Sequence, residues 1–248
     1  MIELEALRVV LVRPRNPNNV GAAARAMANF GLQDLAVADP YEPVWRESAA
    51  AKDGAGDVLA RARKLSLQDA LADCHLVLGA TTGRRRTLSQ PMVLLPDLPA
   101  FLSRRLPPGG RAAVVFGPEK SGLGNEELDR CHAWVKIPTR AEAPSMNLGQ
   151  AVAVIAYELA RAAESSGAKR PSRAARAPKR LLPPMRQMEN LLAAVGEVAR
   201  RVDGKDAALR EARIAQLRKS VLRWDLDRAD AGRLLLLFEK IARKLPEP

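Results

Sequence analysis

Aromatic residues are scarce in this sequence of 248 residues and make up 4% of it. Proteins that bind single-stranded nucleic acid by stacking its bases need several exposed aromatic rings. The composition therefore argues against a stacking platform. If the protein binds nucleic acid, phosphate contacts and shape should dominate.

Cysteine and histidine are equally rare, with two residues of each. They form the dipeptides Cys74-His75 and Cys131-His132, which could together supply a Cys₂His₂ metal site. Adjacent residues entering a strand point to opposite faces, however, so such a dipeptide chelates poorly. We expect no metal and two reduced, partly buried thiols. Without a histidine beside a plausible nucleophile, a Ser-His-Asp hydrolase has little support.

Long apolar runs are also missing, and none approaches the ~20 residues that span a membrane. The acidic start, Met1-Ile2-Glu3-Leu4-Glu5, is unlike a secretory signal. We therefore expect a cytoplasmic protein with no membrane partner.

Glycine-rich nucleotide loops are incomplete. Gly117 and Gly122 have the spacing of a Walker A loop, but Lys120-Ser121 falls inside the loop instead of after it. Gly54-Ala55-Gly56 lacks the third glycine of a dinucleotide fingerprint and a strand in front of it. Neither phosphate-binding class is supported.

Positive charge is abundant, since 40 Lys and Arg against 28 Asp and Glu give a net charge of +12. More than half of this excess lies in residues 169–186, which hold seven basic side chains and no acidic one. A localised basic arm favours a polyanionic partner such as nucleic acid. The same arm can equally be a disordered tether.

Short apolar runs alternate with helical patterns over the first two thirds of the chain. The predicted strands are residues 7–12, 35–38, 76–80, 112–116 and 134–137. Buried strands that alternate with helices indicate an α/β domain with a mainly parallel sheet, which we place at residues 1–165. A basic, proline-containing linker follows at 166–184, and residues 185–248 have the periodicity of a small helical extension.

Three turns marked by glycine or asparagine follow apolar runs. At the carboxyl ends of parallel strands, such turns converge on a ligand crevice. The polar residues that would meet there are Asn19, Arg25, Glu119, Ser145 and Asn147.

Arg25 lies on a predicted helix whose other residues are almost all small and apolar, so we expect the helix to be covered on most sides. Asn18 or Asn19 should cap this helix and Gly31 should end it. A guanidinium in such surroundings is costly to bury unless an anion meets it. That anion is either a carboxylate at the helix edge or part of a substrate.

Three segments, taken in order, are jointly specific. They read Asn19-x-Gly-Ala-Ala-Ala-Arg25, Phe-Gly-x-Glu119-x-x-Gly-Leu-x-Asn-Glu-Glu-Leu and Ser145-x-Asn-Leu. With them, residues 5–163 resemble the SpoU/TrmH branch of the SPOUT RNA 2′-O-methyltransferases. The resemblance implies a Rossmann-like parallel sheet with a C-terminal trefoil knot, a homodimer, and S-adenosyl-L-methionine as methyl donor.

The resemblance also implies methyl transfer to a ribose 2′-hydroxyl of RNA. Among family members, the chain is most similar to those that act on the tRNA anticodon loop, at nucleotide 32. The alternatives are an rRNA methyltransferase of the same family and a catalytically silent RNA-binding member. The C-terminal helices match the family's usual tail only loosely, which leaves the RNA target open.

The family's functional positions can be carried over to this chain. The cofactor would be held by Thr81, Thr82, Gly83, Gly117, Ile137, Pro144, Ser145 and Met146. The catalytic candidates are Arg25, Ser145, Asn19, Glu119 and Asn147. The RNA-binding candidates rest on charge, and residues 84–86 can equally be a solvated turn. Beside the C-terminal extension as a whole, they are Arg84, Arg85, Arg86, Lys169, Arg170, Arg173, Arg176, Lys179 and Arg180. Two features depart from the family pattern: Gly149 stands where Ser or Ala is common, and the loop at 81–84 is one residue longer.

In the implied reaction, Arg25 would hold a phosphate or the developing alkoxide of the target nucleotide, since a guanidinium is a poor base at neutral pH. The hydroxyl proton would leave to a phosphate oxygen or to Arg25 in its neutral guanidine form, which requires a depressed pKa. Ser145 and Asn147 would position the ribose or the cofactor, and Glu119 would orient Asn19. Simpler roles stay open, because both asparagines can be helix caps and Glu119 can pair with a neighbouring cation.

Overall fold

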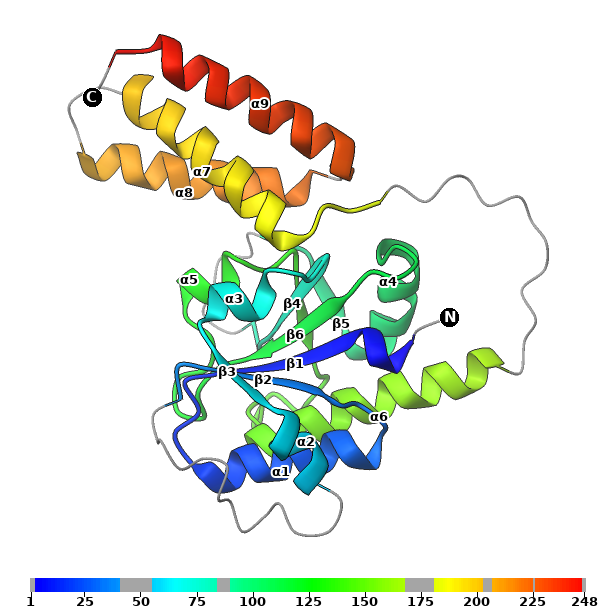
Figure 1. Ribbon diagram of the computed structural model, residues 1–248. Coiled ribbons are helices and arrows are strands. Elements are labelled where there is room, and N and C mark those ends of the chain that lie inside the picture. The colour runs from blue at the N-terminus through cyan, green and yellow to red at the C-terminus, as the bar shows by residue number, and fades with distance from the viewer. Residues whose placement is uncertain are drawn as a thin grey trace.

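The structure, a computed structural model, describes residues 3–40, 55–83, 90–167, 181–202, 207–224 and 226–246. Their core is a parallel sheet of seven strands in the order β3-β2-β1-β6-β4-β7-β5 (Figure 1). The strands are β1 (Leu7–Val12), β2 (Asp34–Ala38), β3 (Arg63–Leu65), β4 (Leu76–Ala80), β5 (Met92–Leu94), β6 (Ala112–Phe116) and β7 (Ala133–Lys136). The predicted α/β class and the five predicted strands are confirmed, with β3 and β5 as additions. The trefoil knot stays a prediction.

The central strands have two apolar faces. β1 is buried along its whole length, with Val9 and Leu11 in one core cluster and Val10 and Val12 in the other. Strands buried on both faces are typical of parallel sheets covered by helices on each side.

Helices from the first two thirds of the chain cover the first face (Figure 1). They are α1 (Pro17–Asn29), α2 (Gly56–Arg61), α4 (Leu98–Arg105) and α6 (Leu148–Gly167), with the 3₁₀ turns η1 (Leu4–Ala6) and η4 (Leu95–Asp97) beside them. α1 packs along α6. α1 contains the first of the three sequence segments and α6 begins at the last residue of the third, so their packing brings these segments together.

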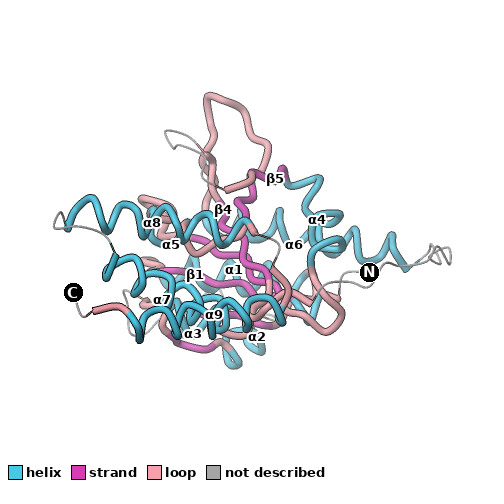
Figure 2. The backbone as a smooth tube through the Cα atoms, turned by 90° about the horizontal axis from the view of Figure 1, so that it is seen from above, coloured by secondary structure: helices cyan, strands magenta, loops and turns pink. Residues whose placement is uncertain are grey.

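The second face is covered by two short helices and a C-terminal bundle (Figures 1 and 2). They are α3 (Leu67–Leu71), α5 (Asn125–Leu128), α7 (Met185–Val202), α8 (Ala207–Arg223) and α9 (Arg228–Lys244). Met185 and Met188 of α7 share a core cluster with Trp134, and the Met185 amide donates to the Cys74 carbonyl at 2.8 Å. The bundle thus completes the core on this face. The division of the chain into catalytic domain, linker and RNA-binding extension stays a prediction.

The ends of α1 differ in part from expectation. Asn16, and not Asn18 or Asn19, is the N-cap, and its side chain accepts the Asn18 amide at 2.9 Å. Gly31 ends the helix as predicted, with φ of +76°. The expected cover on most sides is confirmed, since six of the eight residues from Val20 to Met27 are buried, but Arg25 lies on the exposed stripe of α1. The guanidinium therefore avoids the cost of burial.

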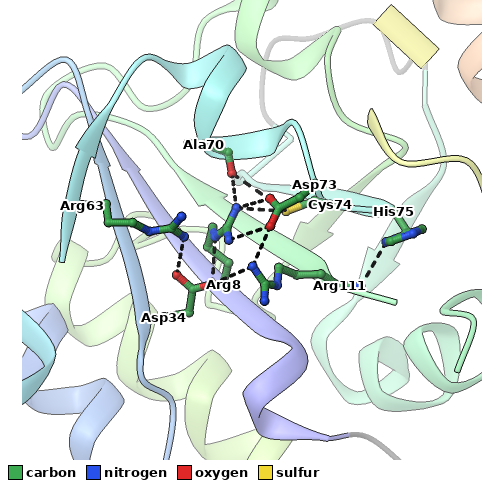
Figure 3. Close-up of polar contacts among 8 residues, drawn as sticks. All are labelled: Arg8, Asp34, Arg63, Ala70, Asp73, Cys74, His75 and Arg111. Atoms are coloured by element: carbon green, nitrogen blue, oxygen red, sulfur yellow. Dashed lines mark hydrogen bonds and ion pairs between the residues drawn. The ribbon is translucent and has the colours of Figure 1, made fainter. Parts of the chain in front are cut away.

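A buried arginine, Arg8, lies inside the apolar run of β1 (Figure 3). Its guanidinium donates to Asp34 at 2.9 Å and to Asp73 at 2.5 and 3.1 Å. Asp34 also accepts a hydrogen bond from Arg63 at 2.9 Å, and Asp73 accepts one from Arg111 at 2.6 Å. Burial by itself would raise the pKa of Asp73, but the hydrogen bond and the charge of Arg8, with that of Arg111, outweigh it and lower the pKa. The network joins β1, β2 and β3 to the turn between α3 and β4 and to the residue before β6.

Both Cys-His dipeptides are tied into the sheet. His75 and His132 each accept a backbone amide at Nδ1, at 3.2 and 3.1 Å. Cys74 and Cys131 are fully buried, and burial raises the pKa of both thiols, to about 12 for Cys74. Within the described residues, no helix is long and apolar enough to cross a membrane.

Candidate active site

A cavity of about 300 Å³ lies at the carboxyl ends of β4, β6 and β7. Its wall is built mainly from the loop after β6 and from the segment between β7 and α6. Seven predicted cofactor residues line it: Thr81, Thr82, Gly117, Ile137, Pro144, Ser145 and Met146. Gly83 is not part of this wall, and its amide instead donates to the Thr81 hydroxyl at 3.2 Å. The volume is at the lower end of small-molecule sites, which run from about 300 to 1,000 Å³.

Gly117 lets the loop after β6 fold back on itself. A Cβ atom at this position would lie 2.2 Å from the carbonyl carbon of Gly122 and 2.2 Å from the amide nitrogen of Leu123. Both neighbours are backbone atoms, so no side-chain rotation could relieve the overlap. The close return of the chain shapes one wall of the cavity, and it requires glycine.

The Glu119 carboxylate holds the start of α1. It accepts the Asn19 side-chain amide at 2.8 Å and the backbone amides of Arg15 and Asn16 at 3.1 and 3.2 Å. Burial alone would raise the pKa of Glu119, but these hydrogen bonds outweigh it and lower the pKa. Glu119 is therefore ionised at neutral pH and acts as an acceptor for the loop between β1 and α1.

Asn147 continues this chain of hydrogen bonds. Its Nδ2 donates to the side-chain Oδ1 of Asn19 at 2.9 Å, and its Oδ1 accepts the Gly149 amide at 2.9 Å. Asn147 thus caps α6 and contacts α1 at the same time. Gly149 has a packing role, since a Cβ there would lie 2.7 Å from the Cβ of Ala22 on α1.

The structure brings together most of the predicted catalytic residues. Glu119, Asn19 and Asn147 form one hydrogen-bonded series that links the three sequence segments. Ser145 is in the cavity wall, whereas Arg25 is exposed on α1 and outside that wall. The predicted RNA contacts Arg84, Arg85, Arg86, Lys169, Arg170, Arg173, Arg176, Lys179 and Arg180 lie outside the described residues.

One pair near the site was not apparent from the sequence. Arg13, directly after β1, donates to the buried Glu127 of α5 at 2.5 Å. The other oxygen of Glu127 accepts the Gly124 amide at 2.5 Å and caps α5. These partners lie more than a hundred residues apart, so no local pattern could have paired them.

A parallel sheet whose carboxyl edge carries a cavity ringed by three polar loops defines an α/β protein that binds a small molecule at that edge. The model of the SpoU rRNA Methylase family matches residues 6–157 of this chain. The chain belongs to that family.

Individual relatives agree with this assignment. The tRNA (cytidine/uridine/adenosine-2′-O-)-methyltransferase TrmJ of Pseudomonas aeruginosa (strain UCBPP-PA14) is 41% identical over 157 residues, which are 63% of this chain and 61% of that protein. TrmJ of Photorhabdus laumondii is 41% identical and is matched over 64% of its length. The chain thus spans less than two thirds of these curated relatives.

Solved structures resemble a larger part of the chain. The crystal structure of TrmJ from Z. mobilis ZM4 is 25% identical, with a TM-score of 0.79, and covers 94% of this chain and 98% of that one. A probable methyltransferase from Bordetella pertussis Tohama I is 33% identical, with a TM-score of 0.59, and covers 64% of this chain and 96% of that one. Because the first match covers 94% of this chain, it includes residues of the C-terminal bundle.

Proposed function

We propose that the protein transfers a methyl group from S-adenosyl-L-methionine to a ribose 2′-hydroxyl of tRNA, in the anticodon loop at nucleotide 32. The observation that carries this proposal is that Glu119 lines a cavity together with the predicted cofactor residues and is hydrogen-bonded in series to Asn19 and Asn147. The names of the relatives, which are tRNA 2′-O-methyltransferases, support the reaction and the substrate class.

The cavity fits the cofactor's chemistry. Thr81, Thr82 and Ser145 offer hydroxyl groups, and Ile137 and Met146 offer apolar surface. The close backbone return at Gly117 lets main-chain groups approach a ligand. When bound, S-adenosyl-L-methionine supplies an electrophilic methyl group on a sulfonium sulfur.

The protein's own residues would place the attacking hydroxyl. Arg25, which is exposed on α1 outside the cavity wall, would hold a phosphate or the developing alkoxide of the target nucleotide. Ser145 and Asn147 would position the ribose, with Asn147 oriented through Asn19 and Glu119. The hydroxyl proton would pass to a phosphate oxygen of the RNA or to Arg25 acting as a neutral guanidine, because a guanidinium has no acceptor.

Further parts of the proposal concern partners. We propose a homodimer with the family's trefoil knot, which binds tRNA in the cytoplasm through its basic arm and its C-terminal helices. The net charge of +12, concentrated at residues 169–186, supports an RNA partner.

The central test is Arg25→Ala, measured as transfer of labelled methyl groups into an unmodified tRNA transcript. We expect transfer to be abolished while calorimetry shows unchanged affinity for S-adenosyl-L-methionine. A matched control is Arg61→Ala, which removes an exposed arginine from α2. Near-normal turnover of the Arg25 variant would contradict the assigned role.

An rRNA substrate is the second candidate, and the name of the matching family model favours it. Competition between tRNA and rRNA fragments, followed by mapping of 2′-O-methyl positions, separates the two. RNA binding without cofactor affinity would instead identify a catalytically silent member.

A further inference from the structure

Arg13 has an unusual backbone for an arginine. Its φ is +45°, in the left-handed region that a residue with a side chain rarely adopts. Such conformations cost free energy, persist only where the surrounding structure imposes them, and cluster at functional sites. The position directly after the central strand β1 is therefore a candidate for function.

The Arg13 side chain is half exposed and contacts a buried carboxylate. Glu127, whose side chain is 6% exposed, accepts from the Arg13 Nη2, whereas the Arg13 side chain is 50% exposed. The buried carboxylate is itself fixed by the Gly124 amide. A guanidinium carries five N–H donors, and among the described residues the Arg13 guanidinium donates to Glu127. The pair therefore holds a cation in a defined place with donors left for a ligand.

Arg13 also stands beside the candidate active site. Two residues further on, the Arg15 amide donates to Glu119, which lines the cavity. On its other side, Arg13 meets α5, which covers the same face of the sheet as the C-terminal bundle (Figure 1). Arg13 thus lies two residues from a contact with the cavity wall and itself contacts a helix on the face that the bundle covers.

We propose that Arg13 contacts a backbone phosphate of the RNA substrate, and that Glu127 is a positioning residue that aims it. The planar donor set of arginine matches the oxygens of a phosphate, and an arginine already held in place loses less freedom on binding. This inference rests on the proposed function, because it requires an RNA substrate.

The test compares variants of the full chain, loaded with S-adenosyl-L-methionine, for binding of an unmodified tRNA transcript over a range of salt concentrations. Arg13→Ala alone would leave Glu127 buried without its partner and could unfold the protein. The double variant Arg13→Ala/Glu127→Gln removes both charges and keeps an acceptor for Gly124. The matched control is Arg161→Ala/Glu158→Gln, which removes a half-exposed arginine and its carboxylate from α6.

We expect the double variant to bind tRNA roughly five- to tenfold more weakly, with the slope of log K against log salt reduced by about 0.9, the value for one lost phosphate contact on duplex nucleic acid. Its cofactor affinity and unfolding midpoint should match those of the wild type. Arg13→Lys should recover part of the binding. Wild-type affinity and salt slope in the double variant would overturn the proposal and leave Arg13 as the counter-charge of Glu127. If the wild-type protein binds no RNA, the proposed function fails instead.

Discussion

Replacing Gly117 by alanine tests whether the backbone return after β6 forms the cofactor cavity. The added Cβ would lie 2.2 Å from Gly122 C and from Leu123 N, whereas carbon atoms pack at about 3.5–4.0 Å. The backbone must therefore move by more than about 1 Å. Leu123 is 1% exposed and anchored in the core, so the displacement should fall on the loop that lines the cavity.

Overpacking of this kind typically costs about 1–3 kcal/mol, and here no rotamer change can relieve it. We expect Gly117→Ala to lower the free energy of unfolding in urea by about that amount. Calorimetry should show S-adenosyl-L-methionine affinity falling by at least tenfold, because a shift of about 1 Å misplaces the loop that contacts the ligand.

Gly109→Ala is the matched control. Gly109 has a left-handed φ of +69°, but a Cβ there would meet no atom within 4 Å. It should cost about 1 kcal/mol of stability through backbone strain and leave cofactor affinity unchanged. If Gly117→Ala bound the cofactor as tightly as Gly109→Ala, the loop would not be the binding wall and the reasoning would be refuted.

Two further predictions concern stability. Arg8→Met should lower the free energy of unfolding by about 3 kcal/mol, because it leaves Asp34 and Asp73 with Arg63 and Arg111 but without their buried partner. Urea unfolding measures this change. A loss below about 1 kcal/mol would contradict the prediction. Burial lowers the pKa of His132 to about 4, so its neutral form is favoured in the folded protein. The contribution of His132 to the free energy of unfolding should therefore be fully present above about pH 6.5 and fall by up to roughly 3 kcal/mol as the pH drops to about 4. His132→Gln should flatten this pH dependence of the urea midpoint. The same slope in that variant would show that His132 is not its cause.

The strands and the motif segments could be predicted from the sequence because their signals are local. A run such as residues 112–116 is apolar at every position. This pattern fits a strand covered on both faces or a buried helix, and five residues are too few for a stable helix. The edge strands β3 and β5 have three residues each, too few to show a period. They form because neighbouring strands offer unpaired backbone groups.

The N-cap of α1 shows where local reasoning stops. Asn16, Asn18 and Asn19 are all good caps by residue type. Asn19 instead donates to Glu119, which lies 100 residues further along the chain, and Asn16 takes the cap. The choice depends on where the loop after β6 lies, and nothing near residue 19 encodes that.

The sequence by itself determined the α/β class, the order of the strands along the chain, and the residues that carry the family resemblance, because apolar periodicity and short motifs depend on nearby residues. Only the tertiary structure decided how charged groups pair. Arg8 finds Asp34 and Asp73 at separations of 26 and 65 residues, and Arg13 finds Glu127 at a separation of 114. Burial makes such pairings obligatory, since an ion removed from water needs a partner, but the partner is set by the packing of the whole sheet.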